Sequence, residues 1–154
     1  METDRLTRWL TLGANLGVLI GLLLLVGEIR QTNSIAKAEA VNAITQNYLT
    51  ILQMQRDPRH IAALDRAEVD WEQLTKEEQI LLSSVGAALF KIFETAYYQH
   101  KFGVYEDDQL ASDLTMLDYS LEAPWLIRQW HFSAEMHSKE FRDFVNERLE
   151  EPEG

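Results

Sequence analysis

The side chain best placed to do chemistry is Glu94, a carboxylate inside an aromatic run. It lies in the segment Phe90-Lys91-Ile92-Phe93-Glu94-Thr95-Ala96-Tyr97-Tyr98-Gln99, on a helix whose other residues are typical of a core. If it is buried, it must receive hydrogen bonds or take up a proton. A raised pKa of Glu94 would suit general acid-base catalysis. A carboxylate that is hydrogen-bonded to a tyrosine, a tryptophan or a helix end is instead structural, and we expect this structural role for Glu94. The candidate buried polar or ligand site comprises Glu94, Tyr97, Tyr98, Trp125 and Trp130.

One group of residues near the C-terminus has the chemistry of a weak metal site: His131, Glu135 and His137. Bundles that hold two metals use Glu-x-x-His on two helices, and that motif does not occur in this chain. The chain also contains no cysteine, which excludes disulfides, zinc-thiolate sites, iron-sulfur clusters and cysteine nucleophiles. We therefore expect these histidines to line surfaces or helix ends, with no metal and no cofactor.

The motifs of common enzymes are absent from the sequence. It has no nucleophile motif, no zinc-protease helix, no calcium loop and no phosphate-binding glycine loop. After residue 31 the only glycines are Gly86, Gly103 and Gly154, too few for a nucleotide loop. We name no catalytic residue and expect the protein not to be an enzyme.

The net charge of −11 lies entirely outside the first 30 residues, where three basic and three acidic side chains cancel. Nucleic acids and anionic membrane surfaces are bound through Lys and Arg that neutralise phosphates. An acidic domain lacks this attraction, so nucleic acid is not an expected partner.

The N-terminal segment is typical of a membrane span. From Trp9 to Gly27, 19 consecutive residues carry no charge, which as a helix is roughly 28 Å and close to the bilayer's hydrocarbon thickness. The run is longer than the core of a signal peptide, and Leu25-Val26-Gly27 places a large residue where cleavage needs a small one. We expect an anchor over residues 1–31, with the span at about 9–27, and membrane lipid as a partner.

Glycines recur every four residues in this span, in the stretch Leu12-Gly13-Ala14-Asn15-Leu16-Gly17-Val18-Leu19-Ile20-Gly21. Residues four apart lie on one side of a helix, and small residues let two membrane helices approach closely. Gly13, Asn15, Gly17 and Gly21 are the expected packing interface, in which the Asn15 amide would hydrogen-bond across the contact. We expect self-association, with another membrane protein as the alternative partner.

The rest of the chain, residues 32–154, predicts an acidic all-helical domain. Helical periodicity runs from Ser34 to about Arg56, and the anchor continues into it with a loosening at Gln31-Thr32-Asn33. Further helices are expected from Pro58 to about Ala67, from the capping box at Thr75-Glu78 to Phe102-Gly103, and from Asp107 to Leu121. Two more follow Pro124 and Ser138, and disorder is expected at about 150–154. The expected fold class is all-α: one transmembrane helix followed by a compact bundle of four to five helices.

The chain resembles a group of small bacterial membrane proteins with one N-terminal span and an all-helical soluble domain. The resemblance rests on Glu28-Ile29-Arg30-Gln31-Thr32-Asn33, Thr75-Lys76-Glu77-Glu78-Gln79, Phe93-Glu94-Thr95-Ala96-Tyr97-Tyr98-Gln99, Phe132-Ser133 and Glu140-Phe141-Arg142-Asp143-Phe144-Val145. It implies this architecture in a bacterial inner membrane, without an assigned activity. Basic residues on the two flanks of the span nearly balance, and the resemblance favours a cytoplasmic soluble domain.

These observations predict a non-enzymatic, membrane-anchored scaffold or accessory subunit that forms homo-oligomers through the glycine face. The alternative is a ligand-binding or catalytic domain centred on Glu94 and the neighbouring aromatic residues. A third hypothesis is an oligomeric pore with Asn15 facing inward.

Overall fold

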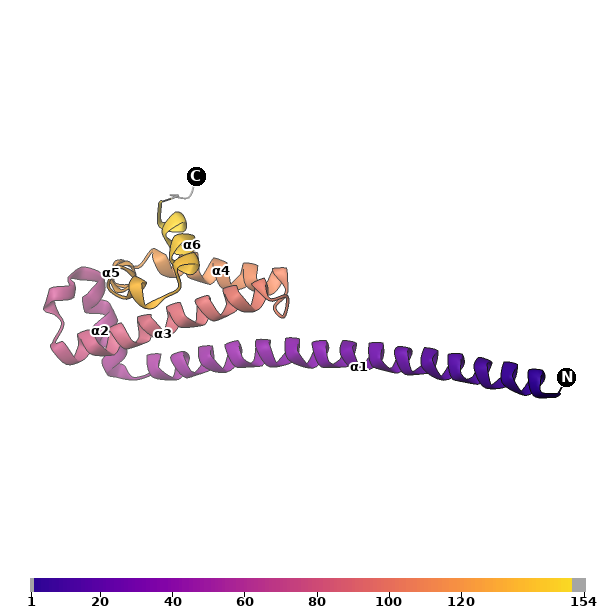
Figure 1. Cartoon of the computed structure of the whole chain (residues 1–154). Coiled ribbons are helices and arrows are strands. Elements are labelled where there is room, and N and C mark those ends of the chain that lie inside the picture. Colours follow the sequence, from indigo (N-terminus) through magenta and orange to yellow (C-terminus); the bar gives the residue numbers. More distant parts are fainter. Residues whose placement is uncertain (1, 151–154) are drawn as a thin grey trace. The chain divides into compact units, whose positions relative to one another are not determined.

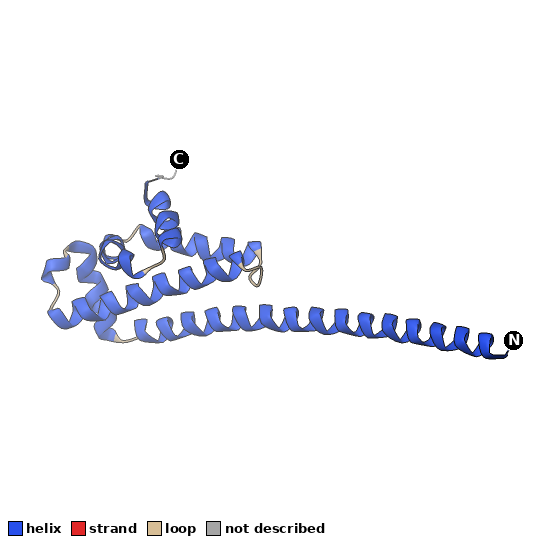
Figure 2. Ribbon diagram, viewed as in Figure 1, coloured by secondary structure: helices blue, strands red, loops and turns tan. Residues whose placement is uncertain are grey.

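A computed structural model describes residues 2–150, and helices joined by short loops, with no strand, make up this part of the chain (Figures 1 and 2). It contains six α-helices and two short 3-10 helices. The chain divides into two compact units, residues 1–39 and residues 40–154. The expected boundary was residue 31, and the expected disordered tail lies almost entirely outside the described residues.

Helix α1 runs from Glu2 to Gln55 and contributes to both units. It passes through Gln31, Thr32 and Asn33 without a break, so the expected loosening is not observed. In the first unit its side chains from Trp9 to Glu28 are all exposed. In the second unit Ile44 and Ile51 of the same helix are buried.

The next helices begin where the sequence supplies a cap. In α2 (Pro58–Val69) the Asp57 carboxylate accepts a hydrogen bond from the Arg59 amide, and Pro58 occupies the first turn. In α3 (Lys76–Lys101) the predicted capping box is confirmed: the Glu78 amide donates to Thr75 Oγ1, and the Thr75 amide donates to the Glu78 carboxylate. The 3-10 helix η1 (Trp71–Gln73) lies between them.

Beyond α3 the chain turns at Gly103, whose φ of 73° lies in the left-handed region that favours glycine. Helix α4 (Asp107–Leu121) follows, then α5 (Pro124–Ser133) with proline in its first turn. The 3-10 helix η2 (Ala134–Met136) leads to α6 (Lys139–Glu150). These helices begin where the sequence predicted them to begin.

Helix α3 is the centre of the second unit, because α2, α4 and α5 all contact it. Its apolar stripe is buried, and each large apolar side chain removed from water contributes roughly 1.5–3 kcal/mol. The largest fully buried apolar side chains around it come from α3, α4, α5 and α6: Leu82, Val85, Phe90, Phe93, Leu117, Leu126, Trp130, Phe141 and Val145.

Gly86 permits the close packing of α3 against α5. A Cβ atom added at Gly86 would lie 2.7 Å from Gln129 Cγ and 3.1 Å from Leu126 Cδ1, and both of those side chains are buried. We expect Gly86→Ala to lower the free energy of unfolding by about 1–3 kcal/mol through overpacking, despite alanine's better helix propensity. Denaturant unfolding of the full chain measures this, with exposed Ser84→Ala on the same helix as the control. A Gly86→Ala protein as stable as wild type would show that the contact is loose.

His60 is fully buried in α2, and neither of its ring nitrogens has a hydrogen-bond partner within residues 2–150. Burial lowers the pKa of His60 below its usual 6.5, and Asp57 opposes this more weakly. A lowered pKa means that the unfolded chain takes up a proton first as the pH falls. The free energy of unfolding therefore keeps its full value, as far as His60 is concerned, above pH 6.5, and it falls progressively as the pH drops below 6.5.

We expect His60→Leu to reduce the fall in unfolding free energy between pH 7 and pH 5. Denaturation curves at both pH values measure this, and the exposed histidine His131 provides the matched variant His131→Leu. Equal pH dependence in wild type and His60→Leu would contradict a buried, unpaired imidazole.

Candidate functional site

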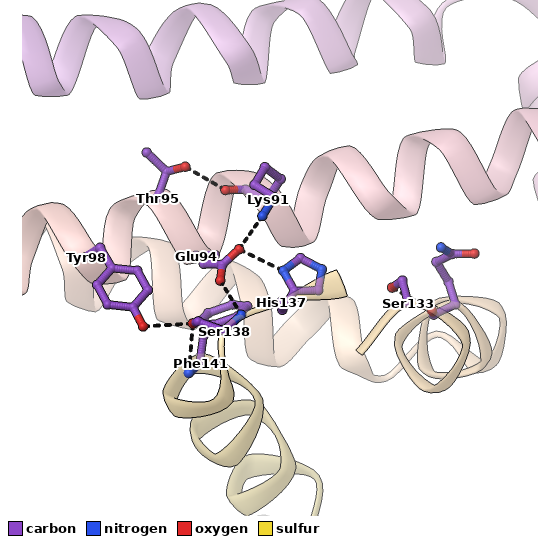
Figure 3. Close-up of polar contacts among 9 residues, drawn as sticks. Lys91, Glu94, Thr95, Tyr98, Ser133, His137, Ser138 and Phe141 are labelled. Carbon is purple, nitrogen blue, oxygen red and sulfur yellow. Dashed lines mark hydrogen bonds and ion pairs between the residues drawn. The ribbon is translucent and has the colours of Figure 1, made fainter. Parts of the chain in front are cut away.

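Glu94 is buried on α3, with 7% of its surface exposed, and its carboxylate faces the segment between η2 and α6 (Figure 3). His137 Nδ1 lies 2.9 Å from Glu94 Oε2, and the Ser138 backbone amide donates to Glu94 Oε1 at 2.8 Å. Lys91, one turn earlier on α3, places its ammonium 2.5 Å from Oε2. Both carboxylate oxygens therefore have donors.

Ser138 links this carboxylate to the beginning of α6. Its hydroxyl accepts a hydrogen bond from Tyr98 at 2.8 Å and a longer one of 3.4 Å from the Phe141 amide (Figure 3). The second bond satisfies one of the free amides in the first turn of α6. Polar contacts beside the aromatic core thus join α3 to the beginning of α6, through Glu94, Tyr98 and Ser138.

The electrostatics of Glu94 are those of a stable anion. Burial raises the pKa of Glu94, but hydrogen bonds from Lys91, the Ser138 amide and His137 outweigh it and bring the pKa to about 2. A general acid or base needs a pKa near the working pH, and therefore a raised one in a carboxylate. This geometry favours the structural interpretation of Glu94.

Two of the predicted aromatic residues lie at this site. Tyr98 reaches it through Ser138, as described above. The Trp130 ring centre lies 5.4 Å from that of His137 and 4.8 Å from that of Phe90, and the indole Nε1 donates to Asn146 Oδ1 at 2.9 Å. Trp130 therefore packs between the site and the core.

The other two predicted aromatic residues lie elsewhere. The Tyr97 hydroxyl donates to Glu140 at 2.9 Å, and its ring packs against Phe144 with 4.9 Å between centres. Trp125 is buried and lines a separate hollow of about 450 Å³ with Leu89 and Tyr119. The structure does not bring either side chain to the Glu94 carboxylate.

The weak metal candidates are not assembled into a site. Glu135 pairs with Arg142, His137 faces Glu94 and His131 is exposed. Within residues 2–150 no group of three or more His, Asp or Glu side chains is placed to hold a metal ion.

The predicted helix interface divides into two faces. Gly13, Gly17 and Gly21 are exposed, and a Cβ atom added at any of them would meet no described residue's atoms within 4 Å beyond the glycine's own helical neighbours. At about 100° per residue, Asn15 lies roughly 160° around the helix from the middle of this stripe. Asn15 instead lines a shallow hollow with Thr7 and Thr11. The three glycines share a face that Asn15 does not.

A second carboxylate, Asp113 on α4, is half-buried and was not predicted. It accepts hydrogen bonds from Tyr105 at 2.8 Å and from Tyr48 of α1 at 3.4 Å. Burial raises the pKa of Asp113, and the two hydroxyls only partly offset this. Sequence spacing could not reveal this contact, because the donors lie 65 and 8 residues away. His137 and Ser138 were missed as partners of Glu94 for the same reason, although a serine before a helix indicates a cap.

Because folding lowers the pKa of Glu94 from 4.5 to about 2, its charge stabilises the fold above pH 4.5. That contribution falls as the pH drops toward 2. We expect Glu94→Gln to lower the unfolding free energy by about 3 kcal/mol at pH 7 and by much less at pH 2.

Denaturant unfolding at both pH values measures this. Glu135→Gln, an exposed carboxylate that also has a cationic partner, is the control and should change stability by about 0.5 kcal/mol or less. A Glu94→Gln protein with full stability at pH 7 would contradict a structural role.

Comparisons with known proteins give no relative for this chain: no protein-family model matches it, and no match is found among curated proteins or solved structures. The structure agrees with the resemblance in architecture: residues 2–150 fold into helices, and the first of them is apolar.

Proposed function

We propose that this chain is a single-span membrane protein that self-associates through Gly13, Gly17 and Gly21 and holds an acidic helical domain as a scaffold or accessory subunit. The observation that carries the proposal is that the apolar part of α1 is uncovered. Between Leu10 and Val26, eleven Leu, Ile and Val side chains are exposed. At roughly 1.5–3 kcal/mol each, moving them from water into lipid would contribute on the order of 20 kcal/mol.

A second helix meets the same length and composition criteria, and its surroundings differ. Both α1 and α3 are long and apolar enough to cross a membrane. Half of the apolar window of α3 is buried among its neighbours, whereas none of the window in α1 is. This contrast supports α1 as the span and α3 as the core of the helical domain.

The open glycine face supports self-association. In lipid, helices associate through close van der Waals packing, which small residues allow. Each glycine lies about 40° further around the helix than the one four residues before it, so the three form a slightly oblique stripe. Two helices that pack along such stripes cross with a right-handed angle, as glycine-mediated pairs do. Asn15 lies on the other side, so the proposed interface consists of the glycines alone.

The charge and the polar contacts of the helical domain support a role as a scaffold or accessory subunit. Its net charge of −11 keeps copies apart by repulsion, so contact between copies is assigned to the span. Glu94, the best candidate for chemistry, has donors on both oxygens. The proposal therefore places no reaction in this domain.

We expect Gly17→Leu to reduce the wild-type oligomer to single chains. A Cβ atom added at Gly17 meets nothing within 4 Å in the described part of the chain, so a loss of assembly would report contact between copies. Light scattering of the full chain in mild detergent measures the copy number. Leu19→Phe, which adds bulk about 200° around the helix from Gly17, is the control and should leave the copy number unchanged. Retention of the oligomer in Gly17→Leu, or its loss in Leu19→Phe, would contradict the proposed interface.

A further inference from the structure

A groove on the helical domain is lined by several exposed, large apolar side chains. It has a volume of about 530 Å³, and its large apolar side chains come from η1, α3, α5 and η2: Trp71, Ile80, Phe132 and Met136. Of these, Ile80 is 58%, Met136 68% and Phe132 73% exposed. Apolar side chains gathered in one exposed place indicate an interaction site. We call this feature the α3–α5 groove.

The shape of the α3–α5 groove fits a helix. The α3 residues that line it run from Lys76 to Ala87 at spacings of three and four, so they form one face of about three turns, roughly 16 Å long. Small side chains, Ser83 and Ala87, lie along this face between the large ones. A small-molecule pocket encloses most of its ligand. Here the large apolar side chains stay mostly exposed, as in grooves that receive the apolar face of an amphipathic helix.

The charge of the α3–α5 groove is opposite to that of its domain. Lys76 and Arg128 are the charged residues that line it, both basic, on a domain with a net charge of −11. The Lys76 ammonium makes no ion pair within the described part of the chain. Arg128 stacks on the Trp71 ring at 5.5 Å and pairs with Glu72 at 3.0 Å, which holds its guanidinium at the rim. Lys76 therefore offers an unpaired positive charge at the groove, with the Arg128 guanidinium also at the rim, and complements an acidic partner.

We propose that the α3–α5 groove binds an acidic amphipathic helix of a partner protein. The apolar face of that helix packs against Trp71, Ile80, Phe132 and Met136, and its acidic side chains face Lys76 and Arg128. This gives the domain a specific docking function and does not depend on the glycine face of α1.

The test uses the full chain in phosphatidylcholine nanodiscs, because free detergent would compete for an apolar groove. Two fluorescein-labelled 15-residue helical peptides serve as probes, with leucine on one face and either glutamate or lysine on the other. Fluorescence anisotropy should show at least tenfold tighter binding of the glutamate peptide. The overall charge of the domain would favour the lysine peptide, so the expected preference has to come from the groove.

Variants assign the binding to the groove. Phe132→Ser should weaken the glutamate peptide at least tenfold, whereas Phe102→Ser, which is equally exposed at 73% outside the groove, should not. Lys76→Glu combined with Arg128→Glu should reverse the peptide preference, and Lys139→Glu on α6 should not.

Three results would overturn the proposal. The first is equal binding of the two peptides, and the second is equal weakening by Phe132→Ser and Phe102→Ser. The third is a lower copy number of the Phe132→Ser protein without peptide, which would show that a second copy occupies the groove. Because Gly17 and Phe132 lie in different units, the first two results would leave the proposed span interface untouched. The third would move contact between copies to the groove, and the Gly17→Leu measurement would then show whether the span contributes as well.

Discussion

Apolar surface must be removed from water, and this constraint decides the role of each long helix in the chain. Helix α3 satisfies it internally, since Leu82, Val85, Phe90 and Phe93 are buried among neighbouring helices. The first part of α1 cannot, because its leucine-rich surface is exposed throughout and no other element of its unit is available to cover it. A lipid bilayer, together with the glycine face of α1 in another copy, would bury this apolar surface. On the proposed function, the two long helices would meet one physical requirement in different ways.

The polar contacts of the helical domain follow from the same burial. Once α3 is enclosed, its carboxylate at Glu94 has to receive donors, and the beginning of α6 supplies them through His137 and Ser138. Asp113 differs, since the donors that it has among the described residues are two tyrosine hydroxyls, and its pKa is raised where that of Glu94 is lowered. His60 has no hydrogen-bond partner among the described residues. Buried polar groups therefore hold α6 in place at one end of the domain and leave a pH-sensitive point in α2.

Much of the fold was predictable because its signals are local. The capping box at Thr75, the prolines at the beginning of α2 and α5, and the glycine after α3 each act within a few residues. The partners of Glu94 were not predictable, since 43 or more residues separate it from His137 and Ser138. Asn15 shows another limit: it is close to the glycines in sequence, but the helical twist places it on another face. The α3–α5 groove could not be predicted either, because its lining residues, from Trp71 to Met136, come together only in the folded domain.

The central claim is that α1 is a membrane span through which copies of the chain assemble. Native mass spectrometry of the complex extracted gently from its own membrane, with every subunit identified, tests this most directly. The account predicts two or more copies of the 17.8 kDa chain in each complex, with or without a further subunit docked on the helical domain. A chain that is released as a single copy under conditions that preserve other membrane assemblies would contradict it.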